Sequence, residues 1–381
     1  MTQSNRFHSA LIPDSRLLQG LLGLRGIAAC AVVLCHICFF TGIKVPAGFN
    51  FIERDFGYGA QLFFVLSAFS LMHSTEHTMH RQDWVREYLI KRLFRIAPLF
   101  YLVLAFMIVA KSVTSGLPSI SNIILNVCFV FGFLPDPKFG LVWGGWTIGV
   151  EMIFYVLFPV FLVVSKTKNQ ALIFLMIALV ISYVARVELH AQYFNVIANP
   201  HPKLDWNYYS FVPNLYFFAV GIYAYRIKQG LVNASRVLWI VIPIVALITL
   251  GTLLLTEVGR LLENPGRLDL IVWALGFGAL CVWQSAKPSF WSANRLFEYW
   301  GERSYSIYLL HPVIIYFSKS YIESLYLSFQ YSIGAYAYFI CAALVLLVVL
   351  ACSEVTYRVI EISGIRLGRK MIVTLRSKMA I

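Results

Sequence analysis

Long apolar runs alternate with short polar or basic segments along almost the whole chain. A helix needs about 20 mostly apolar residues to cross the hydrocarbon core of a bilayer. By that measure the sequence predicts ten spanning helices, at 22–43, 57–75, 95–112, 143–165, 170–187, 209–225, 237–256, 268–286, 304–322 and 332–352. The pattern indicates an all-α fold, a polytopic transmembrane helical bundle that forms a single domain over residues 1–381.

The apolar segment 119–136 differs from these spans, because it contains Asn122 and Asn126 and ends in Pro135-Asp136-Pro137. Counting it as a full span would invert every later loop and place the basic C-terminal segment outside. We therefore expect a short re-entrant or interfacial helix on the outer side of the membrane.

The positive charges orient the predicted bundle. With a cytoplasmic N-terminus, lysine and arginine gather in the inside loops, which are 76–94, 166–169, 226–236, 287–303 and 353–381. The loops on the other side carry few basic residues, as the positive-inside rule requires. The sequence thus predicts a multi-pass protein of the cell inner (plasma) membrane with both termini cytoplasmic, residues 1–20 forming an N-terminal segment and 353–381 a basic tail.

The amino-acid composition also indicates a protein whose surface lies mostly in lipid. The chain is 59% hydrophobic and 13% charged, whereas soluble domains carry about 25% charged residues. The net charge of +13 would suggest nucleic acid in a soluble protein. Here the basic residues lie between apolar runs, so topology and anionic membrane lipids account for them, and no nucleic-acid partner is expected.

The seven cysteines lie in or beside apolar runs. The cluster Cys35-His36-x-Cys38 matches neither the spacing of zinc ligands nor that of a haem attachment motif. We interpret the cysteines as buried small hydrophobic residues, and no metal site is expected.

Two ionisable residues share one face of the first predicted helix. His36 lies eleven residues after Arg25, which returns to the same face about 16 Å deeper in the membrane. Ionisable groups inside spans are costly and are by default functional. The alternatives are an interfacial snorkelling anchor for Arg25 and a hydrogen-bonded core histidine for His36.

Arg92 and Arg95 stand one helical turn apart at the start of the third predicted helix. Residues at this spacing share a face, and two planar guanidinium groups suit bidentate recognition of phosphate. Anchoring at the cytoplasmic surface explains two arginines equally well.

Further polar residues lie within the fourth and ninth predicted spans. Glu151 occurs early in a helix that enters from the outside, and a carboxylate there needs a partner. His36 is expected at comparable depth, so the geometry allows a Glu151–His36 pair. Tyr305, Tyr308 and His311 follow one another at steps of three residues. This stripe is too polar for lipid contact and should face the interior of the bundle.

Six short motifs follow one another along the chain. They are LRGIAA (24–29) with His36, GAQLFFVLSAF (59–69), RLFRIAP (92–98), WTIGVE (146–151) followed by Phe154-Tyr155, SYSIYLLH (304–311) and YRVIE (357–361). Together they resemble the membrane-bound acyltransferase-3 family, which includes O-antigen and exopolysaccharide O-acetyltransferases. Two positions depart from the family's usual pattern, Ala68 where glycine is usual and Met152 where an acidic residue often follows the glutamate.

The resemblance implies an acyl-CoA donor, usually acetyl-CoA, that enters from the cytoplasmic side. The acceptor would be a hydroxyl of a cell-surface glycan or lipid-linked saccharide. The implied roles are donor binding by Arg25, Arg92 and Arg95, and general base catalysis by His36 with Glu151 orienting it or stabilising its imidazolium. Substrate binding is implied for Trp146, Tyr305, Tyr308 and His311.

Two other classes of function use the same residues. A transporter or exporter of glycans or lipid-linked sugars would line its path with these polar groups, but it would not depend on a thioester and on His36. In a structural or sensory membrane protein the polar groups would only fix helix packing. Substitution of His36 would then change the stability of the protein and leave the cell's products unchanged. The sequence leaves the sugar, the acyl chain and the oligomeric state open.

Overall fold

The computed structural model describes residues 15–76, 78–134, 139–196, 209–231, 237–256 and 267–379. These residues form helices joined by turns and loops and include no strand. Within the part of the chain that the structure describes, eight helices are long and apolar enough to cross a membrane. The predicted all-α membrane bundle is therefore confirmed, while the count of ten spans and the cytoplasmic termini stay predictions.

A helix occupies each of the ten predicted spans. These helices are α2 (Ser15–Thr41), α4 (Gly59–Glu76), α5 (Trp84–Thr114), α7 (Trp146–Val164), α8 (Lys168–Val196), α9 (Phe211–Gly230), α10 (Leu238–Leu255), α12 (Leu268–Ala286), α14 (Ser304–Phe317) and α16 (Ala337–Thr356). The ninth prediction, 304–322, is divided between α14, which has 14 residues, and the start of α15 (Lys319–Ile333). From Lys319 to Lys378 the chain continues as 60 helical residues, which count as one apolar stretch.

The segment 119–136 forms a short helix, as expected. α6 (Ile120–Val127) has eight residues, and the 3₁₀ turn η2 (Val130–Phe133) follows it. The buried Asn126 amide donates to Phe139 O at 2.7 Å, and its carbonyl oxygen accepts from the Leu141 backbone N–H at 3.0 Å. Asn126, one of the two asparagines that argued against a full span, thus fastens this segment to the loop before α7. Residues 135–138 lie outside the described structure.

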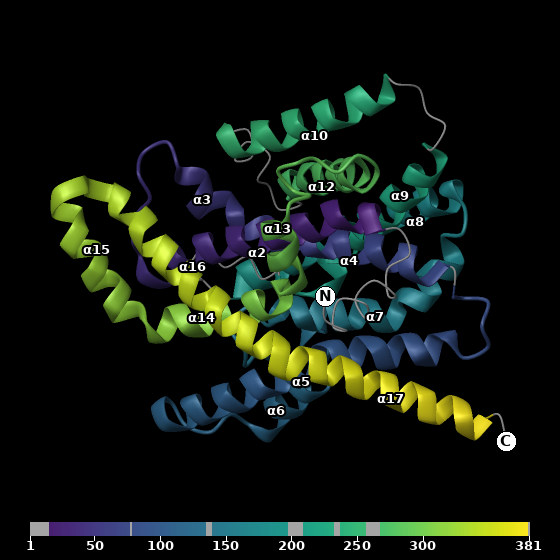
Figure 1. The fold of residues 1–381 in the computed structure, drawn as a ribbon, viewed down its shortest axis with the longest axis horizontal. Coiled ribbons are helices and arrows are strands. Elements are labelled where there is room, and N and C mark those ends of the chain that lie inside the picture. Colours follow the sequence, from purple (N-terminus) through teal and green to yellow (C-terminus); the bar gives the residue numbers. More distant parts are fainter. Residues whose placement is uncertain are drawn as a thin grey trace, which may run out of the picture.

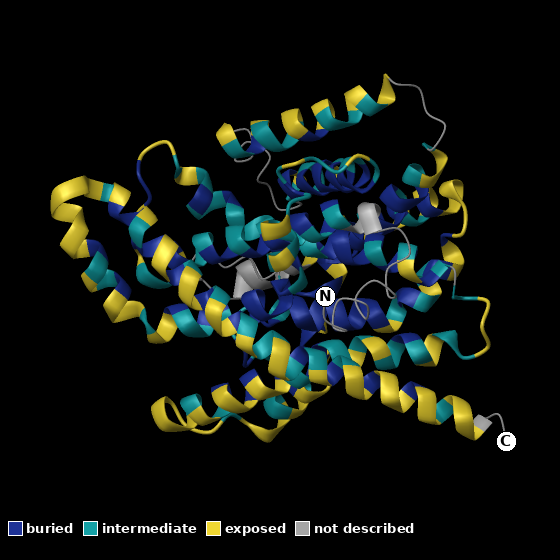
Figure 2. Cartoon of the chain, viewed as in Figure 1, coloured by how far each residue is buried: buried dark blue, intermediate teal, exposed yellow. Residues whose placement is uncertain are grey.

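Burial separates an inner group of helices from outer ones. Figure 2 shows α2, α4 and α12 mostly buried near the centre, whereas α6, α10 and the long C-terminal helix are largely exposed. Valine and isoleucine side chains of α10 are exposed along its length, as expected for a helix that faces lipid. The interpretation of all cysteines as buried was wrong for Cys128 and Cys352, which lie exposed on outer segments.

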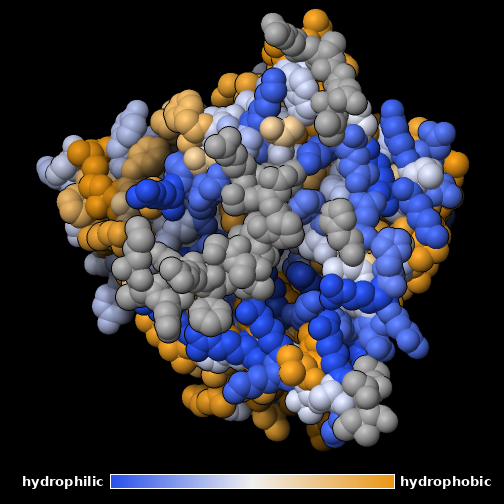
Figure 3. Space-filling model, turned by 45° about the vertical axis from the view of Figure 1, so that its right-hand side comes forward, coloured by the Kyte–Doolittle hydropathy of each residue, from blue (hydrophilic) through white to orange (hydrophobic). Residues whose placement is uncertain are grey.

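Polar residues gather at one end of the molecule. Figure 3 brings forward the side that carries the C-terminus in Figure 1, and hydrophilic residues cover much of this face. Hydrophobic residues lie mostly around its edge. This distribution suits one polar end of a bundle whose sides contact lipid.

Helix α2 packs against its neighbours at the level of the backbone. A Cβ atom added to Gly23 would lie 1.8 Å from Ser292 O, and one added to Gly301 would lie 1.9 Å from Leu22 O. Small residues allow such close approach between membrane helices. The contact fixes α2 against the segment that contains α13 (Arg295–Glu302), and with it the position of Arg25.

The predicted basic tail is helical and packed. α16 continues through a π-helical turn at Tyr357–Glu361 into α17 (Ile362–Met379), which lies along α5 in Figure 1. Arg376 donates two hydrogen bonds to Glu87 on α5, at 2.5 and 2.6 Å. Residues 353–379 are thus part of the bundle. Of the predicted N-terminal segment 1–20, residues 1–14 lie outside the described structure and residues 15–20 belong to α2.

Candidate functional site

A cavity of about 210 Å³ lies between α2, α4, α5, α7 and α14. Six residues singled out in the sequence line it, which are Arg25, Arg92, Arg95, Glu151, Tyr305 and Tyr308. Helices that are far apart in the sequence thus bring the predicted donor-binding arginines together. The predicted residues His36, His311 and Trp146 are not part of its lining.

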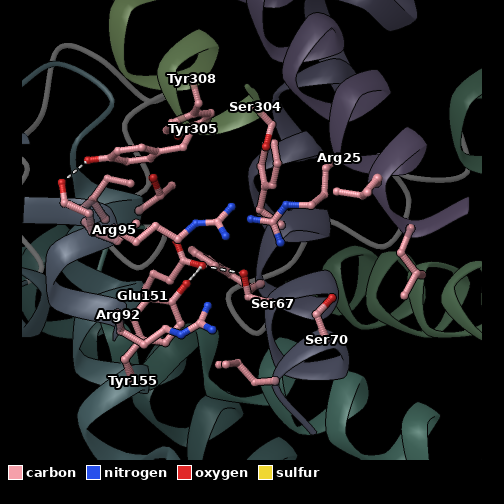
Figure 4. Close-up of a pocket in the computed structure, with 18 of the residues that line it drawn as sticks. Arg25, Ser67, Ser70, Arg92, Arg95, Glu151, Tyr155, Ser304, Tyr305 and Tyr308 are labelled. Atoms are coloured by element: carbon pink, nitrogen blue, oxygen red, sulfur yellow. Dashed lines mark hydrogen bonds between the residues drawn. The ribbon is translucent and has the colours of Figure 1, made fainter. Parts of the chain in front are cut away.

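The cavity is strongly cationic. Among its described lining residues, three arginines stand against one acidic side chain, Glu151. The Nε atoms of Arg25 and Arg92 are buried and have no hydrogen-bond partner. Figure 4 shows the guanidinium groups of Arg25 and Arg95 pointing toward each other across the space. Guanidinium groups held together without matching carboxylates are suited to bind an anion.

Aromatic rings hold two of these arginines in place. The Arg25 guanidinium lies 5.6 Å from the centre of the Phe63 ring. That of Arg92 lies 5.9 Å from the ring centres of both Tyr88 and Tyr155. Cation–π contacts of this kind orient a guanidinium and leave its N–H donors available.

The Glu151 carboxylate does not pair with His36, contrary to the sequence-based expectation. Its Oε1 atom accepts hydrogen bonds from Ser67 at 2.5 Å and from Tyr155 one turn along α7. It therefore faces α4 and the arginine cavity. Comparable depth suggested the pair, but depth along two helices does not fix the direction in which their side chains point.

His36 instead lies against His311. The two ring centres are 4.9 Å apart, with the planes at 70°. The Nδ1 atoms lie 2.8 Å from Val32 O and 3.1 Å from Ile307 O, each one turn earlier in its own helix. A carbonyl oxygen only accepts, so in the neutral rings Nδ1 carries the proton and Nε2 has the free lone pair. The Nε2 atom of His311 is buried and has no hydrogen-bond partner.

The imidazole pair adjoins the cavity through Tyr308. The Tyr308 ring lines the cavity and lies 5.6 Å from the His311 ring and 5.7 Å from the Phe63 ring. Tyr305, Tyr308 and His311 are all buried, so the prediction that this stripe faces the interior is confirmed. Tyr305 also donates to Ile96 O on α5 at 2.7 Å, which fixes the wall beside Arg95.

Trp146 begins α7 outside the lining, with its ring 6.0 Å from that of Phe64 and 5.3 Å from that of Tyr209. It supports the cavity wall. Sequence reasoning missed Ser67 and Tyr155 as partners of Glu151. Ser67 carried a signal, since it is a polar residue within the apolar run of α4, and Tyr155 lies at the i+4 position from Glu151.

Comparison with known proteins gives the family. A family model described as an acyltransferase domain, Acyl_transf_3, matches residues 18–354. The chain is similar to Acyltransferase MdmB of Streptomyces mycarofaciens, with 30% identity over 152 residues, which are 37% of this chain and 38% of that protein. No solved structure matches the chain. Since the family model spans most of the chain, the resemblance seen in the sequence is confirmed, and the protein belongs to the acyltransferase-3 family of membrane proteins.

Proposed function

We propose that this protein transfers an acyl group, with acetyl as the expected one, from acyl-CoA to a hydroxyl of a cell-surface glycan or lipid-linked saccharide. The observation that carries the proposal is the cavity in which Arg25, Arg92 and Arg95 converge with a single described carboxylate. Coenzyme A presents several phosphate charges at one end, and these arginines are placed to bind them. The family supports acyl transfer as the reaction class.

The thioester end of the donor would reach the imidazole pair past Tyr308. An extended donor bound by its phosphates at Arg25 would place its acyl group near His36, about 16 Å further along α2 at 1.5 Å per residue. Aligning the thioester and the hydroxyl in a space with little water supplies much of the rate enhancement in such a mechanism.

The transfer step uses His36 as the general base. Its Nε2 lone pair takes the proton of the acceptor hydroxyl while the oxygen attacks the thioester carbonyl carbon. The carbon–sulfur bond then breaks, and the leaving thiolate takes the proton from the imidazolium to give free CoA. The hydrogen bond between Nδ1 and Val32 O holds the ring in the required tautomer throughout.

Glu151 has a different role from the one expected, because it lies in the arginine cavity. With its carboxylate held by Ser67 and Tyr155, it offsets part of the repulsion among the three guanidinium groups before the donor binds. Its removal therefore acts on the donor end of the site.

Mass spectrometry of surface glycans tests the proposal. Cells that carry the gene should show glycans heavier by one acyl group than cells that lack it, and complementation with the wild-type gene should restore the difference. In membranes, acetyl-CoA labelled in its acetyl group should transfer label to glycan, whereas acetyl-CoA labelled in its CoA part should not. Identical glycans that merely change their amount at the surface would favour an exporter and contradict the proposal.

A further inference from the structure

A series of aromatic side chains begins beside the His36 ring, which the Phe39 and Phe40 rings contact. We define the aromatic patch as Phe39, Phe40, Trp143, Tyr316 and Phe317. The Phe40 ring lies 5.9 Å from that of His36 and 6.0 Å from that of Trp143. The rings of Trp143 and Tyr316 are 4.1 Å apart. The patch is therefore continuous from His36 outward.

Much of the aromatic patch is open. Phe39, Tyr316 and Phe317 expose 71%, 46% and 51% of their surface. A belt of aromatic residues at the membrane interface is the alternative explanation for exposed rings. The rings of the patch contact one another in a series that begins at His36, and they come from three helices or the turns beside them.

The backbone conformation at Gly144 places the neighbouring Trp143 beside α14. Gly144 adopts a φ of +70°, and a Cβ atom there would lie 3.3 Å from Cγ of Pro312, the residue after His311. The turn before α7 thus packs closely on α14 at the level of His311. A side chain at Gly144 would suffer strain in this conformation and would move Trp143 away.

The imidazole pair presents two hydrogen-bond acceptors. Since both Nδ1 atoms face backbone carbonyl oxygens, each neutral ring offers only its Nε2 lone pair. A single hydroxyl has one proton and can serve only one of them. A buried acceptor without a donor costs about 1–3 kcal/mol, so the partnerless Nε2 of His311 calls for a second donor when the acceptor binds.

We propose that His311 and the aromatic patch form the acceptor subsite for a ring that carries two neighbouring hydroxyls, the vicinal diol of a saccharide. One hydroxyl donates to His36 and reacts, and its neighbour donates to His311 and is held in place. The apolar face of the sugar ring packs on Trp143 and Tyr316, which have both apolar and polar surface. The inference rests on the proposed function and adds the acceptor geometry to it.

A cycle that combines enzyme and substrate changes tests His311. Purified full-length protein in nanodiscs is given acetyl-CoA and a panel of methyl hexopyranosides, and release of CoA thiol is followed. In the wild-type protein, deoxygenation next to the acylated position should lower kcat/KM about tenfold. In His311→Phe, kcat/KM for the parent sugar should fall to the value for the deoxy sugar, and deoxygenation should have little further effect on it.

The conservative variant His311→Gln provides an amide oxygen as acceptor and should keep part of the preference for the diol. A variant that only disturbs folding would lower turnover of parent and deoxy sugars alike and leave their ratio unchanged. If the ratio of kcat/KM for the parent and deoxy sugars is the same in His311→Phe as in the wild type, the proposal is wrong. It is also wrong if the wild-type protein binds acetyl-CoA but acylates no hexopyranoside. If the wild-type protein does not bind acetyl-CoA, that result contradicts the proposed function instead.

The aromatic patch is tested with matched substitutions. Trp143→Ala and Tyr316→Ala should raise KM for the sugar about tenfold and leave KM for acetyl-CoA unchanged. Tyr321→Ala is the control, because Tyr321 is 81% exposed on α15, outside the patch, and should change neither value. An equal rise for both substrates, or an effect of Tyr321→Ala as large as that of Tyr316→Ala, would remove the patch from the acceptor subsite.

Discussion

The imidazole rings of His36 and His311 lie 4.9 Å apart between their centres, although α2 and α14 stand near opposite ends of the chain. Each ring is bound through Nδ1 to a carbonyl oxygen of its own helix. Tyr308, one turn before His311, separates this pair from the arginine cavity. A cationic cavity and a pair of proton acceptors therefore adjoin within one bundle.

His36→Ala should abolish acyl transfer while leaving acetyl-CoA binding intact. The substitution removes the proposed proton acceptor, and a positioned general base contributes about 10²–10⁴ in rate. Turnover and acetyl-CoA affinity are measured on the same purified protein, with the exposed His80→Ala as control. Near wild-type acylation by a stable His36→Ala protein would disprove the assignment and make His311 the next candidate for the base.

Arg25→Ala, Arg92→Ala and Arg95→Ala should each weaken binding of acetyl-CoA by about 10–100-fold, because a hydrogen bond to a charged group contributes about 1.5–3 kcal/mol. Lysine at these positions should restore binding only in part, since an ammonium group lacks the bidentate fork. Isothermal titration with acetyl-CoA measures the effect, and the exposed Arg81→Ala serves as control. If the affinity for acetyl-CoA is unchanged in all three variants, membrane anchoring is the better explanation of these arginines.

Glu151→Gln should lower the thermal stability of the empty protein and increase the stabilisation that CoA provides. Without the carboxylate, three guanidinium groups repel one another in the cavity, and bound phosphates then relieve a larger strain. Thermal unfolding with and without CoA measures both effects. Glu53→Gln, which breaks an exposed pair with Lys44, should show neither. Equal stabilisation by CoA in wild type and Glu151→Gln would contradict this role.

Gly23→Ala should destabilise the protein, whereas Gly251→Ala should not. A Cβ atom at Gly23 overlaps Ser292 O, and overpacking of this kind costs about 1–3 kcal/mol. Gly251 on α10 has open space around it, so alanine there should gain up to about 1 kcal/mol from helix propensity. Thermal unfolding in the same detergent compares the two. A gain in stability for Gly23→Ala would mean that α2 is not packed at its backbone.

Reporter fusions test the predicted orientation. The loop charges predict a cytoplasmic C-terminus and an outer loop at 188–208. A reporter that is active only in the cytoplasm should give signal at the C-terminus and none in the loop, and an outward reporter should give the reverse. The same signal at both places would disprove the ten-span topology.

The sequence by itself determined the helices and much of the arginine cavity. Apolar length is a local property that the bilayer dictates, so each spanning run is visible without its neighbours. The two asparagines that excluded 119–136 as a span were equally local. Arg92 and Arg95 share one face of one helix, so their convergence followed from helical periodicity.

Only the tertiary structure decided which helix faces meet. The rotation of each helix is set by packing against its neighbours, and hydropathy carries little information about it. Backbone contacts at Gly23 and Gly301 fix α2, and the resulting arrangement places His311 beside His36. Glu151 turns to Ser67 and the arginine cavity for the same reason. The basic tail was visible as charge, yet its packing on α5 depends on the partner that Arg376 finds in Glu87.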